Sequence, residues 1–70
     1  MIEIPTQEIK QDIADTQSEI DDYASEIEIL SKRPMENRTR IYLLQGRISQ
    51  RKSFIDKLNQ LLKERELKKL

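Results

Sequence analysis

The chain contains no cysteine and no histidine. Without cysteine it cannot form disulfides, and without either residue it lacks the two side chains that bind transition metals most often. A chain of 70 residues usually needs a disulfide, a metal or a second polypeptide to supplement its small hydrophobic core. Association with another chain is therefore the route to stability that we expect.

Glycine, aromatic residues and long apolar runs are also scarce. With one glycine the chain has no glycine-rich phosphate loop, and we expect no enzyme, no cofactor and no small-molecule substrate. No apolar run reaches the ~18–20 residues of a membrane span, and the N-terminal residues lack the basic flank and apolar segment of a signal peptide. These absences predict a soluble, cytoplasmic protein that does not bind membranes.

What the sequence does contain is a heptad pattern. One heptad position holds Ile13, Ile20, Ile27, Pro34, Ile41, Ile48, Ile55 and Leu62, and a companion position holds Ile9, Thr16, Tyr23, Leu30, Asn37, Leu44, Arg51, Leu58 and Arg65. This spacing returns apolar side chains to one seam, as coiled-coil packing of helices requires. Charged residues make up 37% of the chain, which is typical of long solvated helices. The pattern predicts an all-α protein.

A proline in the middle of the pattern predicts two helices. Pro34 lacks the amide proton that would continue a helix, and the cations Lys32 and Arg33 suit the end of the first one. We predict a single domain over residues 1–70, with a helix over about 7–32, a turn over about 33–37 and a second helix over about 38–68. Thr6 is expected to cap the first helix through its hydroxyl. The turn contains no glycine, the usual C-terminal cap.

The two halves of the chain carry opposite charge. Residues 1–31 contain nine acids and one base, and residues 32–70 contain twelve bases and four acids. An antiparallel hairpin would join residues whose numbers sum to 71 and would bring Glu26 near Arg47. A parallel dimer of one long helix is disfavoured because it would pair acidic halves. A domain-swapped antiparallel dimer of long helices satisfies the same seam and stays open.

The hairpin leaves some apolar residues outside its seam. The predicted seam residues are Ile9, Ile13, Ile20, Tyr23, Ile27, Leu30, Ile41, Leu44, Ile48, Ile55, Leu58 and Leu62. The surplus apolar residues are Ile29, Met35, Tyr42, Leu43, Phe54 and Leu61. Contiguous exposed apolar residues mark interfaces. We predict that one or both groups bind another protein or a second hairpin, the latter giving a four-helix bundle.

These features favour a non-enzymatic protein–protein interaction module: a small adaptor, assembly subunit or inhibitor that acts through the outer face of the hairpin. The alternative is a nucleic-acid-binding accessory protein that uses the basic residues Arg38, Arg40, Arg47, Arg51 and Lys52. Arg51 lies on the seam, where pairing with an acid of the first helix also explains it. By analogy of size alone, the chain fits the accessory proteins of phages and other mobile elements.

Overall fold

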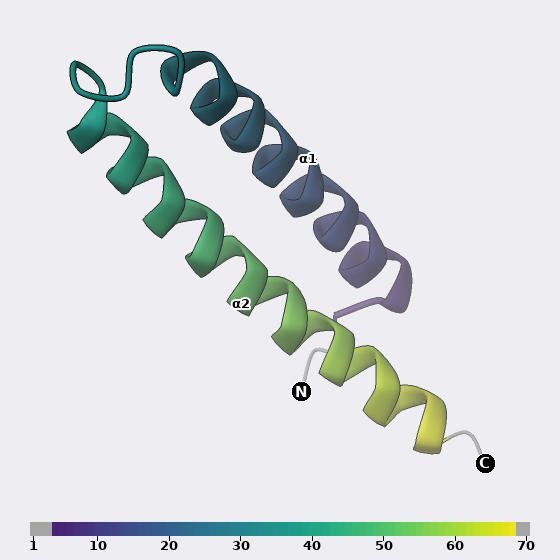
Figure 1. Ribbon diagram of the computed structural model, residues 1–70. Helices are drawn as coiled ribbons and strands as arrows, with labels where there is room; N and C mark the ends of the chain where they lie inside the picture. The colour runs from purple at the N-terminus through teal and green to yellow at the C-terminus, as the bar shows by residue number, and fades with distance from the viewer. Residues whose placement is uncertain (1–3, 69–70) are drawn as a thin grey trace.

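The protein is an antiparallel hairpin of two α-helices that lie side by side along most of their length (Figure 1). The structure, a computed structural model, describes residues 4–68. Helix α1 spans Thr6–Leu30 and helix α2 spans Arg38–Lys68, and the described residues form no other helix or strand. The prediction of an all-α helical hairpin is confirmed.

Helix α1 begins one residue earlier than predicted, and its capping residue is Pro5. The carbonyl oxygen of Pro5 accepts hydrogen bonds from the N–H groups of Glu8 and Ile9, at 3.0 and 3.2 Å. The prediction that Thr6 caps the helix is wrong, because Thr6 is itself the first helical residue. Its hydroxyl instead accepts a 3.2 Å hydrogen bond from the Arg65 guanidinium. This bond joins α1 to α2 at the open end of the hairpin.

Helix α1 ends at Leu30, two residues before the predicted end. Ser31 still has right-handed helical dihedrals, with φ −68° and ψ −10°. The N–H groups of Lys32 and Arg33 then donate to carbonyls three residues back, at 3.3 and 3.1 Å. Hydrogen bonds over three residues, rather than four, tighten the chain where the helix ends. No described residue has a positive φ, so the turn does not depend on a glycine.

Asn37 supplies the cap that a glycine would otherwise provide. Its side-chain amide donates to the carbonyl oxygens of Leu30 and Arg33, both at 3.2 Å. Its own carbonyl accepts the first bond of α2, from the Ile41 N–H at 2.9 Å. One residue therefore bonds to the last carbonyl of α1 and to a carbonyl of the turn, and it also accepts the first bond of α2.

The core is a thin seam between the helices. Among the described residues the buried apolar side chains are Ile9, Ile20 and Leu44, and the polar Thr16 is buried with them. The other nine predicted seam residues are half-buried. The hairpin measures 53 × 21 × 14 Å, and it has two broad faces, one on each side of the seam.

No helix in the described part of the chain has the length and apolar character needed to cross a membrane.

Candidate protein-interaction surface

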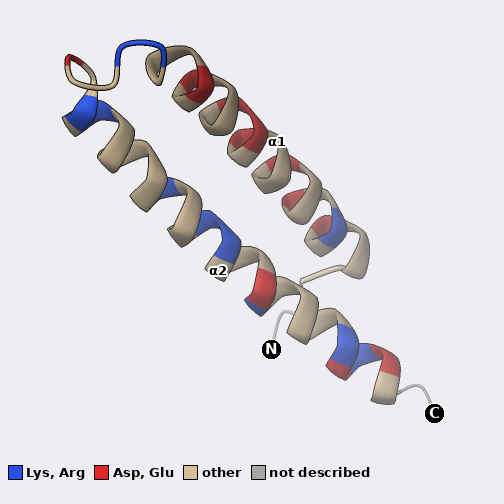
Figure 2. Ribbon diagram, in the orientation of Figure 1, with Lys and Arg blue, Asp and Glu red and all other residues tan. Residues whose placement is uncertain are grey.

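The two helices present opposite charges to solvent. Acidic residues predominate on α1 and basic residues predominate on α2, although the C-terminal half of α2 also carries acidic residues (Figure 2). Residues 6–30 contain eight acids and one base, and residues 38–68 contain nine bases and three acids. Because the helices lie side by side, the hairpin has an acidic edge and a basic edge.

Two ion pairs connect the acidic helix α1 to the basic helix α2. The guanidinium of Arg40 donates two hydrogen bonds to Glu26, at 2.9 and 3.2 Å, and Arg51 pairs with Glu19 at 3.2 Å. The side chains of both pairs are well exposed, so each pair stabilises the fold by a few tenths of a kcal/mol at most. Their contribution is to fix which sides of α1 and α2 share a face.

The predicted neighbour of Glu26 is wrong: it pairs with Arg40 and not with Arg47. The two arginines are seven residues apart and lie in the same stripe of α2. In the predicted register one lies on each side of the level of Glu26. Heptad counting identifies the stripe, but it cannot say which of two long side chains the carboxylate binds. Among the described residues Arg47 forms no ion pair.

The Glu26–Arg40 pair identifies one broad face, which we call the mixed face. Residues at a spacing of seven share a stripe of a helix. The mixed face consists of Asp12, Glu19 and Glu26 from α1 with Arg40, Arg47, Phe54 and Leu61 from α2. Phe54 is 43% exposed, whereas Leu61 is half-buried beside the seam. Leu43, one turn before Arg47, lies at the outer margin of this face and is 54% exposed.

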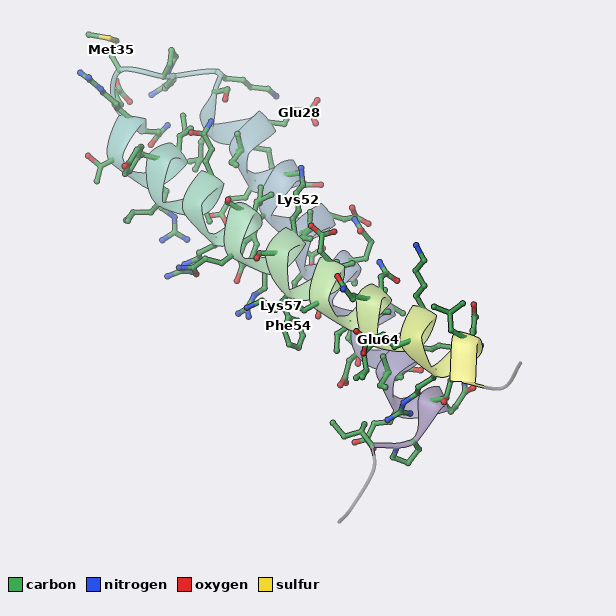
Figure 3. The ribbon with its side chains drawn as sticks, turned by 90° about the horizontal axis from the view of Figure 1, so that it is seen from below. Glu28, Met35, Lys52, Phe54, Lys57 and Glu64 are labelled. Carbon is green, nitrogen blue, oxygen red and sulfur yellow. The ribbon has the colours of Figure 1, made fainter. Side chains whose placement is uncertain are left out.

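The opposite broad face, which we call the polar face, has a different composition. It consists of Lys10, Gln17 and Ala24 from α1 and Ser31, which follows α1, with Arg38, Gln45, Lys52 and Asn59 from α2. All eight residues are exposed. In Figure 3, Lys52 projects to the other side of α2 from Phe54 and Lys57. None of the eight is a large apolar residue.

The turn end carries the remaining predicted interface residues. Ile29, Met35 and Tyr42 are all strongly exposed there, and Met35 projects away from both helices (Figure 3). A shallow hollow opens beside them, and its lining residues are Pro34, Arg38, Thr39, Ile41, Tyr42 and Gln45. The hollow is open to solvent, so it suits contact with a protruding side chain rather than enclosure of a small molecule.

The five bases of the nucleic-acid alternative are not brought together. Arg40 and Arg51 are engaged by acids of α1. Arg38 and Lys52 lie on the polar face, and Arg47 lies on the mixed face. Neutralising several neighbouring phosphates needs cations on one continuous surface. Pairing between the helices accounts for Arg40 and Arg51. The other three bases form no ion pair with the described residues and are divided between the two faces.

Sequence reasoning missed two exposed apolar residues at the open end. Ile4 is 49% exposed and Leu67 is 62% exposed. Leu67 borders a second open hollow on α2, whose other lining residues are Asp56, Asn59, Gln60, Lys63 and Glu64. Both residues lie outside the heptad seam. Their positions in the repeat could therefore have predicted that they are exposed. No group of three or more potential metal ligands occurs among residues 4–67.

No protein-family model, curated protein or solved structure matches this chain.

Proposed function

We propose that this chain is a non-enzymatic protein–protein interaction module, an adaptor, assembly subunit or inhibitor that acts through the outer surface of the hairpin. The observation that carries the proposal is the accessible surface of the hairpin, which is larger than that of a compact protein of the same mass. The accessible area is 6067 Å², whereas a compact monomer of 8.4 kDa exposes about 4,600 Å². Association with another protein removes such a surplus from water.

The distribution of apolar residues supports the same proposal. Phe54 and Leu43 lie on or beside the mixed face, and Met35 and Tyr42 lie at the turn end. Large apolar side chains supply most of the binding energy at protein interfaces. Three buried apolar side chains in the part of the chain that the structure describes are a small core for this length, so a partner would also add to the stability of the fold. A cytoplasmic location and an origin in a phage or other mobile element stay predictions.

Site-specific photo-crosslinking in the cells that make the protein tests this function. Benzoyl-phenylalanine replaces Phe54 in one variant and Ser53, its exposed neighbour on the outer edge of α2, in a control. We expect the Phe54 probe to give protein adducts that survive nuclease treatment, and the Ser53 probe to give few. Adducts to nucleic acid alone, or equal labelling by both probes, would overturn the proposal.

A further inference from the structure

We propose that the partner of the mixed face is a second copy of this chain, related by a twofold axis parallel to the length of the hairpin. The two turns then lie at the same end of a four-helix bundle. This inference rests on the proposed interaction function and specifies its partner and geometry.

Charge selects this axis over the alternative. Two hairpins stacked through the same face can be related by an axis along their length or by one across it. The axis along the length places α1 of each copy on α2 of the other, so the acidic edge meets the basic edge. The axis across the length places α1 on α1 and α2 on α2, so that the acidic stripe of α1 faces its own copy and the arginines of α2 face the α2 of the other copy. Opposed like charges cost free energy at an interface.

The apolar residues of the mixed face are covered in this arrangement. An axis along the length keeps every residue at the level of its own copy. Because α1 of each copy lies over α2 of the other, Phe54 and Leu61 face α1 of the second copy. Burial there removes the exposed ring of Phe54 from water. Charge is therefore what selects the axis, and the apolar residues supply buried surface.

Arg47 gains a partner in this arrangement. Within one hairpin, Glu26 is bound by Arg40, and Arg47 forms no ion pair with the described residues. When α1 of the second copy lies over α2, the acidic stripe of Glu19 and Glu26 passes the level of Arg47. The intramolecular and intermolecular ion pairs then use different arginines of the same stripe.

The mixed face is large enough for a stable dimer. A broad face measures 53 × 21 Å, which is a footprint of roughly 1,100 Å². Stable protein complexes bury about 800 Å² on each partner. The polar face has the same footprint, but it offers no large apolar residue from its stripes and carries bases on both helices.

The absence of cysteine allows a direct test by spin labelling. One variant carries Met35→Cys at the turn, where the side chain is 88% exposed, and another carries Leu67→Cys near the open end, where it is 62% exposed. The distance between the two nitroxides of a dimer is measured by pulsed electron resonance on the full chain. We expect both distances to be well short of the 53 Å length of the hairpin.

Each other result overturns the inference in a recognisable way. Long distances at both sites mean that the turns lie at opposite ends. A short distance at Met35 with a long one at Leu67 means a domain-swapped dimer of long helices. No distance between labels at either site, with a monomeric mass by sedimentation, means that the second copy is not the partner. In the last case the photo-crosslinking at Phe54 still decides whether the face binds another protein.

Discussion

The two broad faces of this hairpin lie on either side of one seam and differ in what they offer to solvent. The mixed face has acids on α1, and on α2 it has two arginines followed by Phe54 and Leu61. The polar face has two lysines, one arginine, amides and small residues, and every residue of its stripes is exposed. The seam and the ion pair of the mixed face account for the fold, so folding does not require an exposed phenylalanine on one face. That residue is the basis of the proposal that the mixed face binds a partner.

The turn end and the open end make a second contrast. At the turn, Asn37 bonds to two carbonyls and the chain reverses without a positive φ. At the open end, the helices are joined by the bond between Arg65 and Thr6, at 3.2 Å. The turn is therefore held by local bonds between one side chain and the backbone, whereas the open end depends on a bond between two side chains. We expect the hairpin to fray from the open end.

The largest effect comes from breaking the seam that supports both faces. Leu44 is 1% exposed, so Leu44→Ala removes buried methyl groups and leaves a cavity, at a cost of about 2–5 kcal/mol. In a fold with so small a core this change should unfold most of the protein at room temperature. Helix content by circular dichroism during urea unfolding measures it.

The neighbouring residue gives the matched control. Leu43 is 54% exposed, so Leu43→Ala should lower the free energy of unfolding of the hairpin by less than about 1 kcal/mol. Equal losses for the two variants would mean that the seam is not the core of the molecule.

The next largest effect separates the two faces. Phe54→Glu places a carboxylate at the centre of the mixed face and should weaken self-association at least about 30-fold, because buried aromatic anchors carry about 2–4 kcal/mol at interfaces. Asn59→Glu makes the same change of charge on the polar face and should leave the dissociation constant within about threefold. Sedimentation velocity over a hundredfold range of concentration measures both.

Thermal unfolding of the Phe54→Glu variant at low concentration checks that the hairpin itself remains folded. Phe54 is preferred to Leu61 for this test because Leu61 is half-buried and its replacement would also damage the seam. Equal weakening by Phe54→Glu and Asn59→Glu would remove the distinction between the faces.

A smaller effect should follow from reversing one charge on each face. Arg47→Glu should weaken self-association about tenfold, since it removes an attraction to the acidic edge of the second copy and adds a repulsion. Lys52→Glu on the polar face should have little effect. The difference between the two variants should shrink as salt rises, because exposed charges are screened. A steeper loss for Lys52→Glu would reverse the assignment of the faces.

The sequence predicts the fold better than it predicts the contacts around the fold. The heptad positions identify the seam because burial depends on which side of a helix a residue occupies, and a repeat of seven fixes that side. The partner of Glu26, the hydroxyl of Thr6 and the amide of Asn37 depend on axial level and on rotamers, which a repeat does not determine. The composition of the mixed face is less predictable than the seam and more predictable than the individual contacts. Its stripes follow from spacing, and the predicted approach of Glu26 to Arg47 already joined them. The bond between Glu26 and Arg40 shows that these two stripes do share a face.

The smallest effect concerns the outer edge of α2, which belongs to neither face. Gly46 lies there in mid-helix, and a Cβ added to it would meet no atom within 4 Å. Gly46→Ala should therefore raise the free energy of unfolding by up to about 1 kcal/mol, because alanine loses less backbone entropy in a helix. If the second copy binds the mixed face, the same variant should keep the dissociation constant of the parent chain. A stabilised hairpin that associates more weakly would instead mean that a partner approaches the backbone at Gly46, and would move the interface from the mixed face to this edge.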